Sequence, residues 1–242
     1  MQHQPLILAL LAGLSLSGAA QATLIDRGGG LIYDTGLNIT LLQNANLGAT
    51  DLFGVSTDSG SLMNWFQANQ WIGAMNTADY LGYSDWRLPT TAPINGSTFN
   101  YNFSFNGTTD VGYNVSAPGT AYAGSTGSEM AYLFYNDLGN KAYYDTSGNP
   151  QAGFGVTNAG PFQNLQSNPY WSGTEFAAYS NNAWIFNPND GRQDSTYKLH
   201  DAYAWAVRPG DVAPAPNSVP EPGTLGLFAI GLLGLGLARR RG

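Results

Sequence analysis

The stretch Gly82-Tyr83-Ser84-Asp85-Trp86-Arg87-Leu88-Pro89-Thr90 combines a helix stop, a large apolar ring, a charge and a chain breaker. Gly82 suits the left-handed position that ends a helix, because glycine adopts that conformation without steric cost. Trp86 is too apolar to stay in water, so Arg87 beside it needs a carboxylate or carbonyl partner if it is buried too. Pro89 prevents a helix or a central strand from continuing. The sequence therefore predicts a structural junction at Tyr83, Asp85, Trp86, Arg87 and Pro89.

Composition indicates one globular domain rich in turns. The chain has 242 residues, of which 43% are hydrophobic and 13% aromatic, enough for a sizeable single core. Only 10% of the residues are charged, well below the usual quarter. Gly, Asn, Ser and Thr replace those charges and favour turns and short strands. We expect an α+β domain with short strands, two helices and long loops.

The charge balance and the absence of cysteine exclude several classes of function. Without Glu221 and the three arginines near the C-terminus, 6 basic and 15 acidic groups remain, a net charge of -9. Such a surface repels phosphate backbones, so we expect no nucleic-acid partner. With no cysteine, the chain has no disulfides, no thiol catalysis and no Cys-based zinc site.

The N-terminal residues have the pattern of a leader for export. An apolar run from Leu6 to Leu16 is followed by Ala20-Gln21-Ala22, a small-x-small cleavage pattern. We predict a signal peptide over residues 1–22, cut between Ala22 and Thr23.

A C-terminal sorting signal follows the domain, which we expect to span residues 23–212. A Pro- and Ala-rich linker at 213–218 leads to residues 219–242, where Pro220-Glu221-Pro222 precedes an apolar run and Arg239, Arg240 and Arg241. This order resembles a PEP-CTERM sorting signal. The resemblance implies an exosortase-type processing enzyme as partner, transient anchoring in the inner membrane, and a final place on the envelope surface or outside the cell.

A permanent membrane anchor is the alternative for the same tail. The apolar run covers residues 223–238, whereas a helix that spans a bilayer needs about 20 residues. The arginines after this short transmembrane segment would stay in the cytoplasm and leave the domain outside.

Periodicity places the first elements of the domain. Two β-prone runs, Leu31–Asp34 and Asn38–Leu42, flank Thr35-Gly36 and predict a hairpin. Ser61 is a possible N-cap for a helix that ends near Leu81, with one apolar face. That face comprises Trp65, Ala68, Ile72 and Met75. A second helix begins after Ser128, with Glu129 in its first turn, and closes at Gly139. Its apolar side comprises Met130, Leu133, Phe134 and Leu138.

An aromatic segment lies between the two helices. Phe99, Tyr101, Phe103 and Phe105 alternate with polar residues and are followed by Asn106-Gly107. This pattern predicts a β-hairpin. Its aromatic face either covers the core or forms an exposed stacking surface. We expect the core, because large exposed apolar patches are uncommon on soluble domains.

The last third of the domain contains three strand-like runs and the candidate ligand site. The runs are Tyr170–Ser172, Ala183–Phe186 and Tyr203–Arg208. We predict that loops from Tyr179 to Lys198 form the ligand surface, because amide, carboxylate and aromatic groups there suit sugar hydroxyls and faces. The candidate glycan-binding residues are Tyr179, Asn181, Asn182, Asn187, Asn189, Asp190 and Arg192.

Catalytic chemistry finds little support in the sequence. His200 is the single histidine of the predicted mature chain, and no Gly-x-Ser-x-Gly elbow accompanies it. A glycosidase needs two opposed carboxylates, for which Asp85, Glu129, Asp137 and Glu175 are candidates. Calcium could bind oxygen donors of the span 187–194, namely Asn187, Asn189, Asp190 and Asp194. Turn formation accounts for the same residues without a metal.

Four blocks along the chain carry a family resemblance. They are Leu31–Asp34, Tyr83–Thr90, Tyr170–Thr174 and Ala204–Arg208. In this order they resemble the Lcl C-terminal domain family, which is named after a collagen-like adhesin. The resemblance implies a C-type-lectin-like fold, also seen in formylglycine-generating enzymes, with N- and C-terminal strands paired. The cysteines of those enzymes and the sugar-calcium motifs Glu-Pro-Asn and Gln-Pro-Asp are missing here.

Two hypotheses about function remain. The first is an exported binding protein without enzyme activity or cofactor, calcium excepted, that contacts polysaccharide in adhesion or a biofilm matrix. The alternative is a polysaccharide hydrolase with a carboxylate pair. Two carboxylates facing one another across an open cleft would favour the hydrolase.

Overall fold

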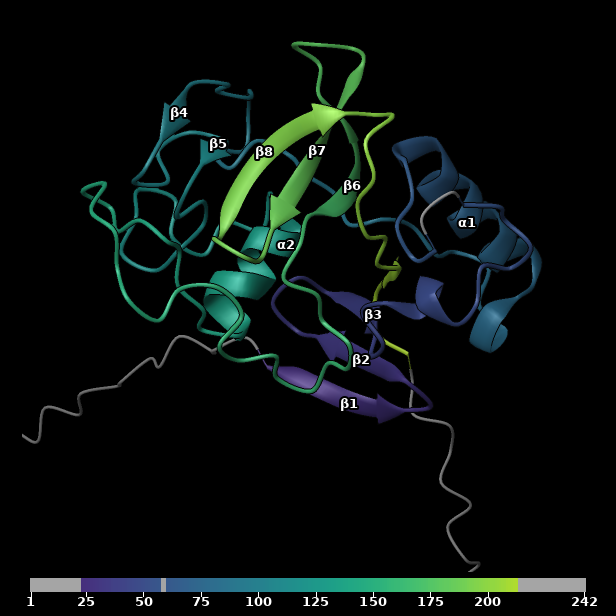
Figure 1. Cartoon of the computed structure of the whole chain (residues 1–242). Coiled ribbons are helices and arrows are strands. Elements are labelled where there is room, and N and C mark those ends of the chain that lie inside the picture. Colours follow the sequence, from purple (N-terminus) through teal and green to yellow (C-terminus); the bar gives the residue numbers. More distant parts are fainter. Residues whose placement is uncertain (1–22, 58–59, 213–242) are drawn as a thin grey trace, which may run out of the picture.

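The computed structural model describes residues 23–57 and 60–212. These residues form a mixed α+β fold of two sheets with a helical segment between them (Figure 1). The expected fold class is confirmed. The first sheet has the order β1-β2-β3-β9. Its strands are β1 (Leu24–Gly28), β2 (Leu31–Asp34), β3 (Ile39–Leu42) and β9 (Val207–Pro209).

Both ends of the domain meet in this first sheet. The predicted hairpin is present as β2 and β3, with Asp34 opposite Ile39. The last strand, β9, lies antiparallel beside β3, and Arg27 of β1 donates a 2.9 Å hydrogen bond to Asp211. The sheet therefore closes the domain around its own termini.

The second sheet has the order β4-β5-β8-β7-β6. Its strands are β4 (Phe103–Ser104), β5 (Val111–Gly112), β6 (Tyr170–Glu175), β7 (Asn182–Asn187) and β8 (Arg192–Tyr197). Strands β7 and β8 pair antiparallel over their whole length, from Asn182 opposite Tyr197 to Asn187 opposite Arg192. The expectation that residues 179–198 are loops is wrong for this hairpin.

Strand β8 could not be recognised from the pattern of apolar residues, because its buried side chain is polar. Gln193 is buried, donates to the backbone carbonyl of Asp110 at 2.8 Å and accepts from the hydroxyl of Ser128. A buried amide with both ends satisfied substitutes for an apolar residue. The sequence of β8 therefore shows no alternation of apolar and polar residues.

Helix α1 (Trp65–Thr77) begins three residues later than predicted. Its N-cap is Asn64, not Ser61, because Asn64 and Gln67 each accept the other's backbone N–H in a capping box. The helix also ends before Leu81. A separate 3-10 turn, Tyr80–Gly82, follows it, and Gly82 takes the expected left-handed conformation at φ +81°.

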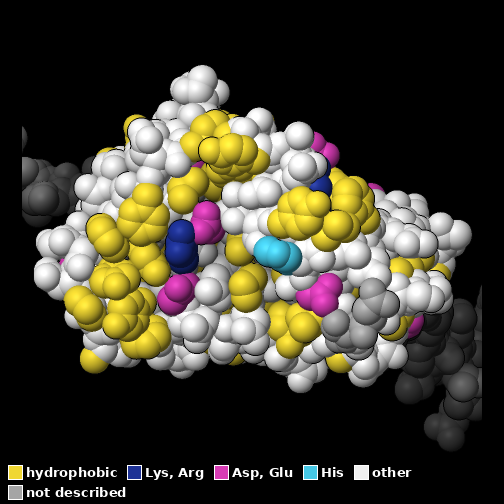
Figure 2. All heavy atoms as spheres, turned by 45° about the horizontal axis from the view of Figure 1, so that its top comes forward, with side chains coloured by type: hydrophobic (Ala, Val, Ile, Leu, Met, Phe, Trp, Pro, Cys, Tyr) yellow, Lys and Arg dark blue, Asp and Glu magenta, His cyan; other side chains and the backbone are white. Residues whose placement is uncertain are grey.

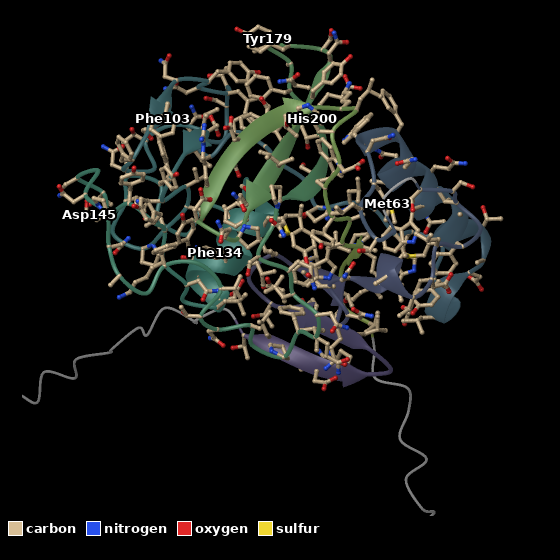
Figure 3. All side chains as sticks on the ribbon, in the orientation of Figure 1. Met63, Phe103, Phe134, Asp145, Tyr179 and His200 are labelled. Atoms are coloured by element: carbon tan, nitrogen blue, oxygen red, sulfur yellow. The ribbon has the colours of Figure 1, made fainter. Side chains whose placement is uncertain are left out.

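The second helical segment lies between the two sheets (Figure 1). Helix α2 (Glu129–Tyr132) has the predicted cap, Ser128, and continues into a π-helical turn, Leu133–Asp137. Its predicted apolar residues are all buried. Phe134, labelled in Figure 3, packs on Phe186 of β7 with ring centroids 5.2 Å apart. This segment therefore supports the second sheet from below.

At the junction the structure gives Arg87 the carboxylate that it needs. Its guanidinium donates two 2.7 Å hydrogen bonds to Glu129 at the start of α2. The same carboxylate accepts the backbone N–H of Thr90 at 2.7 Å. Beside it, Trp86 is 2% exposed, and the amide of Asn76 holds its backbone N–H and carbonyl. The junction thus ties α1 to α2.

Neighbouring residues join the junction to both sheets. Asp85 accepts a 2.8 Å hydrogen bond from Arg208 of β9, whose guanidinium lies 4.1 Å from the ring centre of Tyr83. The carbonyl of Pro89 accepts the hydroxyl of Ser172 at 2.9 Å. These contacts place β9 and β6 on either side of the same nine residues.

The core fills the space between the sheets and α1. Trp71, Trp171 and Trp205 are fully buried. Each donates its indole N–H to a backbone carbonyl, at distances of 3.0, 2.7 and 2.8 Å. Burial of these large rings is therefore compatible with satisfied hydrogen bonds.

The predicted aromatic hairpin does not form. β4 and β5 are two residues each and run parallel, with Phe103 beside Val111. Asparagine side chains compete with strand pairing here, since Asn100 and Asn106 accept backbone N–H groups two residues further on. The buried carboxylate of Asp110 also takes the N–H of Asn100 at 2.7 Å. The segment is consequently a compact loop rather than a regular ladder.

Candidate functional site

Exposed aromatic side chains gather on and around the segment that carries β4. Phe103 is 46% exposed and Tyr179, on the loop between β6 and β7, is 69% exposed. Together with three further residues they form what we call the aromatic ridge. Its members are Tyr101, Phe103, Phe105, Phe154 and Tyr179. The expectation that this aromatic segment covers the core is therefore wrong for three of its four rings.

The interior beneath the segment is already filled, which explains the exposure. Val111, Phe176 and Trp184 form a small buried cluster. Phe99 packs against it 5.1 Å from the Trp184 ring, and the outer ring of Tyr101 lies 4.8 Å from the Phe176 ring. Phe103 and Phe105 lie outside this cluster. A sequence shows which residues share a face, but not whether that face meets an occupied or an empty space.

Ring contacts hold the ridge in place. Phe103 packs edge-on against Phe105 at 5.0 Å, and Phe105 stacks on Tyr113 with an interplanar angle of 2°. At the other end, Tyr179 stacks on Phe176 with an angle of 11°. A binding surface of this kind loses little side-chain entropy on contact with a ligand, because its rings are ordered beforehand.

Charged groups of the β7–β8 turn lie beside the ridge. The guanidinium of Arg192 stands 5.3 Å from the ring centre of Phe103 and is paired with Asp194. Figure 2 shows hydrophobic side chains on one side of this face, next to a basic side chain that lies between acidic ones. Stacking surfaces and hydrogen-bonding groups therefore occur together.

Asp190 is anchored from two sides within the turn. Its carboxylate accepts the N–H of Arg192 at 3.1 Å and the hydroxyl of Tyr113 at 3.3 Å. Burial, partly offset by these hydrogen bonds, raises the pKa of Asp190. Burial, assisted by the charge of Asp190, raises the pKa of Tyr113 to about 12. Tyr113 therefore stays a hydrogen-bond donor at neutral pH.

The structure separates the predicted site residues into two groups. Tyr179, Asn181 and Asn182 lie at the start of β7, whereas the others lie at the β7–β8 turn. At about 3.3 Å per residue the length of β7 keeps the groups roughly 17 Å apart. The turn group comprises Asn187, Asn189, Asp190 and Arg192. Only this second group adjoins Phe103.

Several groups at these positions already have partners. The backbone carbonyl of Asn181 accepts from Lys198 at 2.8 Å, and the Asn187 side chain accepts the N–H of Asn189 at 3.2 Å. Sequence reasoning expected Tyr101, Phe103 and Phe105 in the core and did not single out Phe154. The alternation over 99–105 also allowed an exposed surface for the first three, whereas Phe154 carries no sequence signal that distinguishes it from a core residue.

Residues 23–208, most of the chain, match the family model of the Lcl C-terminal domain. The chain belongs to the Lcl C-terminal domain family. Residues 218–241 match the PEP-CTERM protein-sorting motif. This motif supports export, sorting to the cell envelope and processing by an exosortase. No curated protein and no solved structure matches the chain.

Other predicted features of this Lcl chain fall outside the described residues. They are the signal peptide up to Ala22, the linker 213–218, and the sorting signal with Pro220, Glu221, Pro222 and Arg239–Arg241. The predicted short transmembrane segment at 223–238 falls there too. Within residues 23–57 and 60–212, no helix combines the length and apolarity needed to cross a bilayer.

Two carboxyl groups face one another inside this Lcl domain. Asp34 of β2 is 0% exposed, and its Oδ2 and both carboxyl oxygens of Asp137 are closed to water and have no hydrogen-bond donor among the described residues. Burial first, and then the charge of Asp34, raises the pKa of Asp137 to about 8. Such a pair shares a proton. A glycosidase pair must flank a sugar, and no sugar reaches this one.

The remaining acidic candidates are each held by a cation. Asp85 pairs with Arg208, Glu129 with Arg87, and Glu175 lies 3.1 Å from the ammonium of Lys198. In the described part of the chain no three His, Cys, Asp or Glu side chains gather in a way that could hold a metal ion. Of the four donors considered for calcium, Asp194 is paired with Arg192.

His200 lies on the same face as β8 but away from Phe103 (Figure 3). It lines an open hollow of about 530 Å³ with Ile185 and Leu199. The Nδ1 atom of His200 is 2.8 Å from the hydroxyl of Thr196, four residues earlier. This contact closes a local turn.

Proposed function

We propose that this Lcl C-terminal domain is a non-catalytic, carbohydrate-binding protein of the cell surface or extracellular matrix, where it contributes to adhesion or biofilm formation. The observation that carries the proposal is the aromatic ridge beside the β7–β8 turn. Sugars present C–H faces that pack on aromatic rings, and hydroxyl groups that pair with amides, carboxylates and guanidinium groups.

Exposure of the ridge supports a binding role. Contiguous apolar surface on a soluble domain commonly marks an interaction site. Here the surface consists of ordered rings next to Asn189, Asp190 and Arg192, so it offers both contact area and direction. Export and sorting to the cell envelope support a polysaccharide as the ligand.

The charge of the domain narrows the class of glycan. A net charge of -9 outside the terminal segments repels highly sulfated chains, which pair with clusters of basic residues. The described basic side chains are spread over the molecule rather than clustered. The proposed ligand is consequently a neutral or weakly charged exopolysaccharide.

Binding of the purified domain, residues 23–212, to the host's own exopolysaccharide tests the proposal. Phe103→Ala removes an exposed ring, so the fold itself should change little. We expect the affinity for the polysaccharide to fall about tenfold, which equals about 1.4 kcal/mol. Asn189→Ala with Asp190→Ala should weaken binding as well. Measurement at two salt concentrations, with and without calcium, separates polar from ionic contributions.

Phe66→Ala is the matched control. Phe66 is 54% exposed and lies on α1, on the opposite side of the molecule from β4 (Figure 1). Its removal should leave binding unchanged. Equal losses in the Phe103 and Phe66 variants, or tight binding to heparin that weakens with salt, would count against this site and this ligand class.

Processing of the tail is tested separately. Intact-mass analysis of protein extracted from the cell surface should show a chain that begins at Thr23 and ends near Pro220-Glu221-Pro222. A chain that still ends at Gly242 would favour the permanent membrane anchor.

A further inference from the structure

Lys141 differs from every other basic side chain that the structure describes. The other five each form an ion pair with a carboxylate. They are Arg27, Arg87, Arg192, Lys198 and Arg208. Lys141 is exposed and has no acidic partner within residues 23–57 and 60–212. In a domain this acidic, an unpaired ammonium is available for an external anion.

Lys141 lines a hollow of about 400 Å³ whose wall includes further polar side chains. Thr146 and Gln151 also line it, and their side chains make no hydrogen bond to the described residues. Asp145 is fixed at the rim, because its carboxylate accepts the N–H groups of Ser147 and Asn149 at 2.9 and 2.8 Å. These hydrogen bonds lower the pKa of Asp145, so it stays an acceptor. The hollow thus offers a cation, neutral hydrogen-bonding groups and an acceptor.

The backbone that carries Lys141 is held in place on both sides. Its carbonyl accepts the N–H of Gly155 at 3.0 Å, and both chain neighbours, Asn140 and Ala142, are buried. The amide of Asn140 accepts the N–H groups of Thr157 and Asn158 at 3.0 and 2.9 Å. Lys141 itself is exposed and lines the hollow.

The hollow and the aromatic ridge share a wall. Asn114, which lines the hollow, donates from its amide to the backbone carbonyls of Phe105 and Tyr144 at 2.7 and 2.9 Å. The ring of Phe105 lies against Gly148, in the loop that follows Asp145. Figure 3 shows Phe103 and Asp145 on the same side of the molecule, away from Met63. A glycan on the ridge can therefore continue into the hollow.

We propose that this hollow is a subsite for a carboxylated sugar, a uronic acid residue, whose carboxylate pairs with Lys141 while neighbouring uncharged sugars stack on the ridge. The inference rests on the proposed function and names its ligand class: a polysaccharide with sparse carboxylates. One ammonium in an acidic surface accommodates one such group. It does not accommodate a densely sulfated chain, because the surrounding acidic residues repel it.

The test compares native exopolysaccharide of the host with the same polymer after its carboxyl groups have been reduced to alcohols. We expect the full domain to bind the native polymer about tenfold more tightly. Lys141→Gln, which removes the charge but keeps a polar side chain one atom shorter, should abolish this preference and leave binding of the reduced polymer unchanged. Lys141→Arg, which keeps the charge, should retain the preference.

Further arms separate the possible failures. Phe103→Ala should weaken binding of both polymers alike, because the ridge contacts uncharged sugars. If it does so while Lys141→Gln binds native polymer like the wild type, the subsite is overturned and the proposed function stands. If the wild type binds neither polymer, the proposed function itself fails. Mild acid treatment removes ketal-linked pyruvate but spares uronic acids, so lost preference after that treatment would overturn the assignment to uronic acid.

Discussion

The junction and the aromatic ridge use the same kinds of side chain for opposite purposes. At the junction, Trp86 is 2% exposed and Arg87 forms two hydrogen bonds with Glu129. At the ridge, Phe103 is 46% exposed and Arg192 lies over its ring. In the first region the guanidinium of Arg87 and the carboxylate of Glu129 satisfy one another inside the protein. In the second, rings and charges still face water, and that difference separates a structural site from a candidate binding site.

The largest expected effect is at the junction. Arg87→Ala leaves the carboxylate of Glu129 without its cation, and we expect a loss of about 3 to 5 kcal/mol in the free energy of unfolding. Arg192→Ala is the control, because its ion pair is more exposed and should contribute less than about 1 kcal/mol. Urea unfolding of both variants measures the contrast. Equal midpoints for Arg87→Ala and the wild type would contradict the structural role of the junction.

A second expected effect concerns the buried carboxyl pair, Asp34 and Asp137, which should make the stability of the domain depend on pH. Burial raises the pKa of Asp137 to about 8 and also raises that of Asp34, while Glu129 and Tyr132 are the other titratable groups that face the pair. The folded state holds a proton that the unfolded chain releases near pH 4. Its stabilising effect is therefore full below pH 4 and is gone above about pH 8.

Asp137→Asn should flatten this dependence, because the amide replaces the shared proton as hydrogen-bond donor to Asp34. Between pH 5 and 8 the wild type should lose up to about 1.4 kcal/mol per pH unit relative to the variant. Thermal unfolding at three pH values measures the difference. Parallel curves for the two proteins would show that the pair holds no proton.

At the ridge the expected change is in binding rather than stability. Phe103→Ala should lower affinity for the exopolysaccharide about tenfold and leave the melting temperature nearly unchanged, because the ring is exposed. Phe134→Ala, in the core, should instead lower the free energy of unfolding by about 3 to 5 kcal/mol. Calorimetry and a binding assay on both variants measure the two effects. A larger loss of stability in Phe103→Ala than in Phe134→Ala would contradict the assignment of Phe103 to a binding surface.

The smallest effect concerns the cap of α1. Asn64→Ala removes the acceptor for the N–H of Gln67 and should cost about 1 kcal/mol. Ser61→Ala should cost nothing measurable, since Ser61 does not cap this helix. A larger loss at Ser61 than at Asn64 would mean that the helix begins where the sequence suggested.

Local rules predicted the elements whose stabilising contacts are local. The hairpin β2–β3, the Ser128 cap and the left-handed Gly82 each depend on residues close together in the chain. The pattern of α1 was also recognised, although Ser61 and Asn64 both suit an N-cap and only the contact with Gln67 distinguishes them. Strand β8 was missed, because Gln193 is satisfied by partners 65 and 83 residues away in the chain.

By itself the sequence determined the α+β class, the family, the sorting signal and the need of Arg87 for a partner. Each follows from composition, from motif order or from the chemistry of one side chain. Only the tertiary structure decided that Glu129 is that partner, that the aromatics from Tyr101 to Phe105 face outward, and that Lys141 alone among the described cations is unpaired. The physical reason is that burial and pairing of a side chain depend on which other side chains already occupy the space around it. Those side chains come from residues distant in the chain.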